Sequence, residues 1–263
     1  MLKSTVSGNI WIGIGAVSVY LAAQAILFND INFSYLALLF SSTVFSYLLH
    51  RLGKPHLKTF HIVIGLFFGS LSLLYFIFHF ELNSVLYLII PTVITTNYLI
   101  SRQIDTYSIR KHAWLKPISI AFTWSWCALG PNWLDSPSYE YVIIFLMIFC
   151  QILSLAIIFD VKDKSLDHAE GISTLAQKFS LPQLKTLCIS IALCAFALMV
   201  IYSISYSLPL SLFLWFSKIY ILQIIVISLI TSNRDSLYYY IYIDGIIVLS
   251  GLYPALHIFI INT

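Results

Sequence analysis

The sequence predicts an all-helical membrane protein, a single domain over residues 1–263 that crosses the bilayer several times. Hydrophobic residues make up 60% of the chain and charged residues only 10%, and the mean hydropathy is +0.91. A soluble domain has too few apolar residues and too many charges to match this composition. The apolar runs are about 20 residues long, which is the length a helix needs to span the hydrocarbon layer. A membrane β-barrel would instead show shorter segments of alternating polarity.

Nine segments are predicted to cross the membrane. The first is longer than the apolar part of a signal peptide and has no small-residue cleavage site after it, so we interpret it as a crossing. The predicted crossings are residues 8–28, 34–50, 59–79, 83–100, 115–132, 139–158, 184–205, 209–231 and 238–261. Gly, Pro, Asn, Asp and Ser are frequent between them, as expected of turns and loops. The breaks are, in order, NDINF, RLGKPHLK, HFELNS, SRQIDTYSIRKHAWLKP, GPNWLDSPS, DVKDKSLDHAEGISTLAQKFSLPQ, SISYSLP and SNRDSL.

The distribution of charge predicts the orientation of these crossings. Of the 14 lysines and arginines, all except Lys218 fall on one side if the crossings alternate in direction. Basic loops remain in the cytoplasm, so we expect a cytoplasmic N-terminus and an outer C-terminus, in the inner membrane of a bacterium. The sequence pattern assigns no role to Lys218, in the eighth crossing, or to Asp244, near the start of the ninth. The net charge of +3 then reflects topology, and no nucleic-acid motif accompanies it.

The four cysteines lie in apolar segments and show no metal-binding spacing. They are Cys127, Cys150, Cys188 and Cys194. Free cysteine behaves as a small apolar side chain. We therefore expect these residues to pack in the core.

An acidic stretch, FDVKDKSLDHAEGIST, directly follows the sixth predicted crossing. Its acids are Asp160, Asp163, Asp167 and Glu170. On a helix with 100° between successive residues, these four fall within an arc of about 80°. A hard cation such as Mg²⁺ binds through one or two carboxylates together with substrate phosphates, so the three aspartates are candidate magnesium ligands, and Gly171 is expected to end or bend the helix. The alternative is a solvated helix whose acids pair with Lys162 and Lys164.

A basic loop, YSIRKHAWLKP, precedes the fifth predicted crossing. Its cations are Arg110, Lys111 and Lys116. Cations that face an acidic metal site suit a diphosphate, whose charge a single metal ion only partly neutralises. The alternative is a membrane anchor, in which the same cations hold the loop in the cytoplasm and Trp114 lies at the interface.

The pattern D-x2-D-x3-D-x3-G-x2-T, formed from Asp160 to Thr174, resembles the second aspartate-rich motif of UbiA-type intramembrane prenyltransferases. The family has nine helices and carries this motif after the sixth. The basic loop, with the Lys-Pro that opens the fifth crossing, is also similar to that of the family. The resemblance covers the whole chain in topology but only about 25 residues in motif.

The resemblance implies a nine-helix bundle and a reaction in which a prenyl group moves from an isoprenoid diphosphate to a hydrophobic acceptor, often an aromatic ring. Asp160, Asp163 and Asp167 would hold Mg²⁺, and the basic loop would bind the diphosphate. Tyrosine, phenylalanine and tryptophan, which make up 16% of the chain, would shield the allylic cation. Prenyl diphosphate, the acceptor and membrane lipid are the expected partners. The identity of the acceptor, the prenyl chain length and the oligomeric state are not readable from the sequence.

The sequence departs from the family at the end of the second predicted crossing, where a first aspartate-rich motif would stand. It has TVFSYLLHRLGKPH there, with His50 and Arg51. In one interpretation Arg51 binds the diphosphate together with Arg110, Lys111 and Lys116 and replaces the charge of one metal ion. In the other, Arg51 pairs with the aspartates and closes the cavity, which leaves a non-catalytic protein for lipid binding, partner binding or transport.

Overall fold

The computed structural model describes residues 2–49, 59–79, 82–100, 109–130, 133, 138–232 and 234–261. These residues form helices and no strand, in agreement with the predicted all-helical class. The long helices are α1 (Leu2–Leu27), α2 (Phe33–Leu49), α3 (Thr59–His79), α4 (Leu82–Ile100), α5 (Leu115–Leu129), α7 (Tyr139–Ala169), α9 (Leu181–Tyr206), α10 (Leu210–Ser228) and α12 (Asp244–Ile261). Short elements complete them: the 3-10 turn η1 (Ile109–Lys111), α8 (Leu175–Lys178), α11 (Ser236–Tyr238) and the π-helical turn η2 (Tyr239–Ile243). Every predicted crossing therefore coincides with helix in the described residues.

Five helical segments in the described part of the chain have the length and composition to cross a membrane. They are Asn9–Leu27, Tyr139–Ala169, Leu181–Tyr206, Leu210–Ser228 and Ser236–Leu256. Two further segments, Phe33–Leu49 and Ile62–Phe78, are apolar but shorter. Large apolar side chains such as Phe67, Phe78 and Ile204 are exposed on the outside of the bundle, where lipid would cover them. An integral membrane protein follows, while the nine crossings and their orientation stay predictions.

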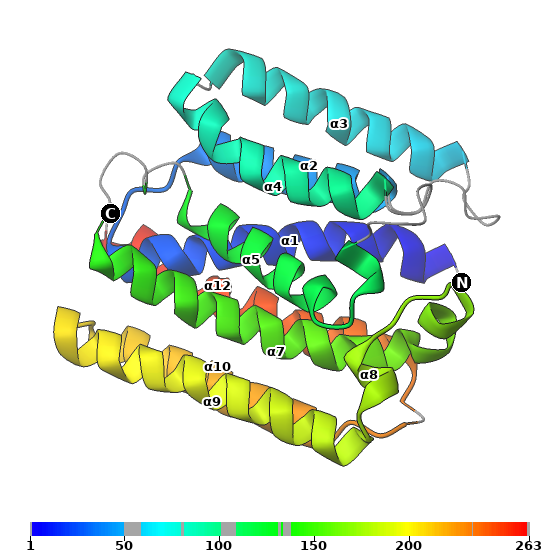
Figure 1. Cartoon of the computed structure of the whole chain (residues 1–263). Coiled ribbons are helices and arrows are strands. Elements are labelled where there is room, and N and C mark those ends of the chain that lie inside the picture. The colour runs from blue at the N-terminus through cyan, green and yellow to red at the C-terminus, as the bar shows by residue number, and fades with distance from the viewer. Residues whose placement is uncertain are drawn as a thin grey trace.

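The helices lie roughly parallel to one another in a layered bundle (Figure 1). Helix α1 packs against α2, α5 and α12, and α7 lies between α5 and α9. Helix α10 joins α9 to α12, and α3 contacts α2 at one edge. Helices α5 and α7 thus share an interface near the centre of the bundle, and they run in opposite directions along it.

Close approach of α1 and α12 requires a glycine. A Cβ atom added at Gly251 would lie 2.1 Å from the backbone oxygen of Ser18, so no larger residue fits at this contact. Small residues that let helix backbones touch are the usual contacts between membrane helices. The same interface brings the side chain of Trp11 to the π-helical turn, where its Nε1 donates to the Tyr240 carbonyl at 2.8 Å.

Helix α7 extends beyond the predicted crossing of residues 139–158. It contains 31 residues, about 46 Å of helix at 1.5 Å per residue, which exceeds the thickness of the hydrocarbon layer. The acids after residue 158 continue the helix, as expected from their spacing on one helix face, and the crossing of residues 139–158 stays a prediction. The helix ends where Gly171 adopts a φ of +68°, as predicted. Asp160, Asp163 and Asp167 therefore lie on the last turns of a long helix.

The cysteines only partly follow the prediction. Cys188 is buried, and Cys127 and Cys150 are half-buried. Cys194 is exposed, so the expectation of a core residue was wrong there. Its helix also exposes Leu193 and Ile201. In a membrane bundle the outer face is apolar too, and hydrophobicity alone does not separate it from the core.

Candidate functional site

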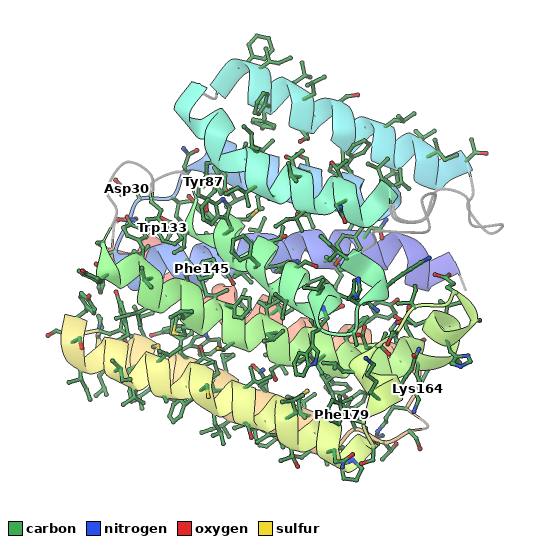
Figure 2. All side chains as sticks on the ribbon, in the orientation of Figure 1. Asp30, Tyr87, Trp133, Phe145, Lys164 and Phe179 are labelled. Atoms are coloured by element: carbon green, nitrogen blue, oxygen red, sulfur yellow. The ribbon has the colours of Figure 1, made fainter. Side chains whose placement is uncertain are left out.

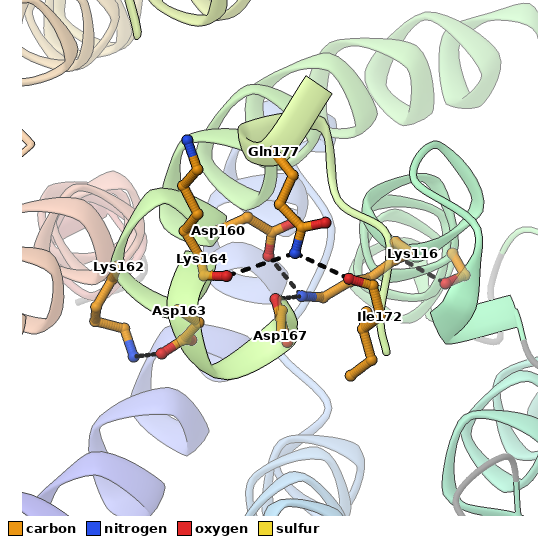
Figure 3. Close-up of polar contacts among 9 residues, drawn as sticks. Lys116, Asp160, Lys162, Asp163, Lys164, Asp167, Ile172 and Gln177 are labelled. Carbon is orange, nitrogen blue, oxygen red and sulfur yellow. Dashed lines mark hydrogen bonds and ion pairs between the residues drawn. The ribbon is translucent and has the colours of Figure 1, made fainter. Parts of the chain in front are cut away.

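The ammonium group of Lys116 lies between two carboxylates at the end of α7. Its Nζ is 2.7 Å from Asp160 Oδ1 and 2.7 Å from Asp167 Oδ2 (Figure 3). The three side chains are only 8%, 7% and 3% exposed, in that order. Asp160 and Asp167 are two turns apart on the same helix face, so one cation reaches both. We call these three residues the buried ion cluster.

The first turn of α5 positions Lys116 for this contact. The preceding turn η1 leads into α5, and the Lys116 amide donates to the His112 carbonyl oxygen at 3.1 Å. Pro117 follows in the first helical turn, where a missing amide hydrogen has little cost. The Ser119 hydroxyl donates to the Lys116 carbonyl oxygen at 2.9 Å. Because α5 packs directly on α7, the lysine side chain extends across the interface between the two helices.

The buried ion cluster carries a formal charge of −1, from one ammonium and two carboxylates. Charges removed from water are stable only when they are paired and hydrogen-bonded. Removing one partner from such a buried group typically costs about 3–5 kcal/mol. The position of Lys116 is therefore strongly determined as long as no other cation satisfies the aspartates.

Asp163 is held by a different cation. Lys162 Nζ is 2.8 Å from Asp163 Oδ1 and 3.4 Å from the Tyr240 hydroxyl. The same ammonium lies over the rings of Phe159 and Tyr240, 4.7 Å and 4.9 Å from their centroids. Lys162 therefore connects α7 to the π-helical turn. The alternative predicted from the sequence, in which Lys162 and Lys164 pair with the acids, holds for Lys162, while the Lys164 ammonium points away from the aspartates in Figure 3.

The loop after α7 folds back onto the helix end. The Ile172 amide donates to the Asp167 carbonyl oxygen at 2.8 Å, and Gln177 Nε2 donates to the Ile172 carbonyl oxygen at 3.0 Å. Thr174, the last residue of the sequence motif, is fully buried. Its hydroxyl has no hydrogen-bond partner among the described residues. The loop is thus held against the end of α7 and carries one polar group that no described residue satisfies.

The structure brings together only some of the residues predicted for the site. Lys116 joins Asp160 and Asp167, whereas the sequence placed this lysine on the diphosphate. Lys111 is half-buried in η1, just before α5. Arg110 is described only in its backbone, and Arg51 lies outside the described residues.

Two residues near the site were not predicted to belong to it. Tyr240 contacts Lys162 from the ninth predicted crossing, and no local sequence pattern indicates this contact. Asp244 starts α12 immediately after the π-helical turn. Its Oδ2 atom is buried without a hydrogen-bond partner in the described part of the chain, and the Lys162 ammonium is close enough to interact with it electrostatically. An acid inside a predicted membrane crossing is the sequence signal that could have indicated this position.

The donor chemistry of the buried ion cluster suits a hard cation. Two carboxylates converge on one point, and Mg²⁺ accepts one or two carboxylates with phosphate and water oxygens in its remaining positions. Within the described residues no three aspartate, glutamate, histidine or cysteine side chains form a group that could hold a metal ion. The carboxylates of Asp160 and Asp167 would therefore fit magnesium if substrate oxygens supplied the remaining ligands and if Lys116 moved out from between them.

Comparison with known proteins identifies the fold. No family model matches the chain, and no curated protein matches it. The structure is similar to that of a solved digeranylgeranylglyceryl phosphate synthase, a protein of membranes, with a TM-score of 0.58 and 16% sequence identity. The match covers 98% of this chain and 100% of the other. At this identity the likeness establishes a shared fold.

Proposed function

We propose that the chain is a divergent intramembrane prenyltransferase of the UbiA type, which transfers a prenyl group from an isoprenoid diphosphate to a hydrophobic acceptor. The observation that carries the proposal is the buried ion cluster at the end of α7, in a fold shared with a prenyl-lipid synthase of membranes. A helical bundle needs no buried charges for its stability. Ionisable groups inside membrane bundles typically mark ligand or ion sites.

The cations of the basic loop would bind the diphosphate. Lys116 is the buried member, and Lys111 lies one short turn before it. Arg110 and Arg51 complete the predicted set. An ammonium shielded from water forms shorter and stronger hydrogen bonds to phosphate oxygens than an exposed one. These residues would therefore hold the diphosphate at the end of α7 and direct the prenyl chain into the bundle.

Asp160, Asp163 and Asp167 would hold Mg²⁺, which supplies charge to stabilise the departing diphosphate. For this the aspartates must separate from the lysines that now satisfy them. Asp160 and Asp167 would release Lys116, and Asp163 would turn from Lys162. The carboxylates on the last turns of α7 are spaced to face the same side.

Aromatic rings beside the Lys162–Asp163 ion pair suit the developing allylic cation. The rings of Phe159 and Tyr240 meet edge to face, with centroids 5.8 Å apart. Both already carry the Lys162 ammonium over their faces. Ring faces attract cations through their quadrupoles, so this pair is a candidate shield for charge on the first carbon of the prenyl group.

A second candidate function is a non-catalytic protein of the same fold that binds lipid. Its support is that lysines contact all three aspartates. In addition, the sequence has no acidic residue between Asp30 and Glu81, where the first aspartate-rich motif would stand. In this case the buried ion cluster closes the end of the bundle, and the apolar interior binds a lipid chain without a metal.

Binding of geranylgeranyl diphosphate to the purified full-length protein separates the two functions. The titration is made with and without Mg²⁺, for wild type and for Asp160→Asn. Asp30→Asn is the matched control, because Asp30 lies at the opposite end of the bundle from Lys164 (Figure 2). Metal-dependent binding that Asp160→Asn loses and Asp30→Asn keeps supports the transferase. Binding that ignores both the metal and the substitution favours the lipid-binding protein.

A further inference from the structure

We infer that Lys116 is a tethered cation that occupies the metal position between Asp160 and Asp167, so that the protein takes up a divalent cation only together with a diphosphate. The inference rests on the proposed function and deepens it, because it assigns Lys116 two alternating partners. Without ligand the lysine holds the carboxylates. With ligand it moves to the diphosphate, and the metal takes the carboxylates.

The two occupants exclude each other on geometric grounds. Both contacts of the ammonium are short, at 2.7 Å, and it fills the space between the carboxylate oxygens. A magnesium ion that bridges the same two oxygens, at about 2.1 Å from each, would have to occupy the position of the ammonium. The side chains are buried, so the two cations cannot be shielded from each other by water. Metal binding therefore requires that Lys116 withdraws.

A diphosphate makes this withdrawal favourable. An ammonium that leaves two carboxylates without finding a new acceptor would remain buried and unpaired. Diphosphate oxygens provide such acceptors next to the metal. Lysine suits this movement because its charge is at the end of a flexible four-carbon chain, anchored on the first turn of α5.

The neighbouring ion pair provides an internal contrast. Lys162 holds Asp163 and also contacts the Tyr240 hydroxyl, so it keeps a partner if Asp163 turns away. Among the ion pairs of the described residues, Lys116 is the cation in contact with two carboxylates at once. The predicted barrier to free metal thus comes from Lys116 and not from lysines in general.

The test begins with the metal alone. Mn²⁺ is titrated into full-length wild type, Lys116→Met and Lys164→Met, and binding is followed by loss of the electron paramagnetic resonance signal of free Mn²⁺. Methionine keeps most of the length of the side chain, being one atom shorter, and removes its charge. Lys164→Met removes an exposed charge from the same helix end and leaves the cluster intact. Lys116→Met is expected to bind Mn²⁺ about 10-fold or more tightly than wild type, a typical strength of coupling between two sites, and Lys164→Met is expected to match wild type.

The second measurement adds pyrophosphate as the probe. Thermal unfolding of wild type is recorded with Mg²⁺ alone, with pyrophosphate alone and with both. A ligand that binds the folded state raises the midpoint temperature. Wild type should show no shift with Mg²⁺ alone and a clear rise with both, whereas Lys116→Met should gain stability from Mg²⁺ alone.

The inference is overturned if wild type binds Mn²⁺ alone as tightly as Lys116→Met does, or if Mg²⁺ alone stabilises wild type as much as the combination. The wild-type measurements decide the matter even if Lys116→Met does not fold. Failure of the proposed function has a different signature, because geranylgeranyl diphosphate would then bind without any effect of metal or of Asp160→Asn. Tight Mn²⁺ binding to wild type with metal-dependent prenyl diphosphate binding would remove the inference and keep the function.

Discussion

The two ends of α7 carry acids that are satisfied in different ways. Near its start, the Glu140 carboxylate contacts the hydroxyl of Tyr202, a neutral donor that also lies 3.0 Å from the Ile26 carbonyl oxygen. Near its end, Asp160 and Asp167 share the charged Lys116. A neutral hydroxyl fixes one acid and links three helices. A cation between two acids can be replaced by another cation, so the second arrangement is suited to binding and the first to stability.

Aromatic packing differs between the same two ends. Around the start of α7, the rings of Tyr87 and Trp126 stack with centroids 4.9 Å apart, and Trp133 stacks on Tyr141. The labelled Tyr87, Trp133 and Phe145 gather at this end in Figure 2. At the other end, ring faces surround the Lys162 ammonium. At the end of α7 the rings therefore contact a cation as well as each other.

The largest expected effect is on the stability of Lys116→Met. Loss of the shared cation removes the Lys116 contact from two buried carboxylates and should lower the free energy of unfolding by about 3–5 kcal/mol. Unfolding of the purified protein in sodium dodecyl sulfate measures the change. The neutral combination Lys116→Met, Asp160→Asn, Asp167→Asn should recover most of the loss. If the single substitution leaves stability unchanged, the ion contacts do not hold this helix end together.

The next largest effect is on prenyl transfer, which should depend on Asp167 at the end of α7 and not on Glu140 at its start. Asp167→Asn should reduce prenyl transfer by about 100-fold or more, as expected for loss of a group that acts on developing charge. Glu140→Gln should leave transfer within a factor of about two, because its partner Tyr202 lies outside the site. Transfer of radiolabelled prenyl groups to extracted lipid acceptors provides the assay. Equal loss in both variants would contradict the division between the two ends.

A smaller effect is expected from Tyr202→Phe. The substitution removes the hydroxyl that satisfies Glu140 and should cost about 2 kcal/mol, since hydrogen bonds to charged groups contribute more than neutral ones. The midpoint of unfolding should fall, and prenyl diphosphate affinity should stay the same. A variant as stable as wild type would show that water or another donor satisfies Glu140 equally well.

The smallest effect is expected from Trp126→Phe. The indole Nε1 donates to the Tyr87 carbonyl oxygen at 2.9 Å, and phenylalanine keeps a ring in the stack but loses this bond. The expected cost is about 1 kcal/mol, the usual net value of a neutral hydrogen bond. Thermal unfolding detects it. A loss of prenyl diphosphate binding without a loss of stability would instead place this ring in the ligand site.

Much of the fold was predictable because each long helix in the described residues coincides with an apolar segment that turn residues bound on both sides. Helix α7 continues past the predicted crossing of residues 139–158 to Ala169, which agrees with the expectation that the acids share one face of a helix. Gly171 ended the helix as predicted, since its positive φ is a local property of glycine. The crossing predicted to end at 132 stops as helix α5 at Leu129, because Gly130 also has a positive φ.

The candidate site was predictable in its acids but not in their partners. Spacing along one helix places Asp160 and Asp167 on a shared face, so the sequence alone indicates their proximity. The reach of Lys116 depends on how α5 packs against α7, and that packing depends on contacts distributed over both helices. The same limit applies to Tyr240, which arrives from a distant helix. The predicted roles of Asp163 on magnesium and of Arg51, Arg110 and Lys111 on the diphosphate stay predictions.

Titration of geranylgeranyl diphosphate with Mg²⁺ into wild type and into the neutral triple variant, Lys116→Met, Asp160→Asn, Asp167→Asn, tests the central claim most directly. The triple variant keeps the shape of the buried ion cluster and removes its charges. We predict that wild type binds the diphosphate and that the folded triple variant does not. Equal binding by the two proteins would contradict the claim that this cluster is the ligand site.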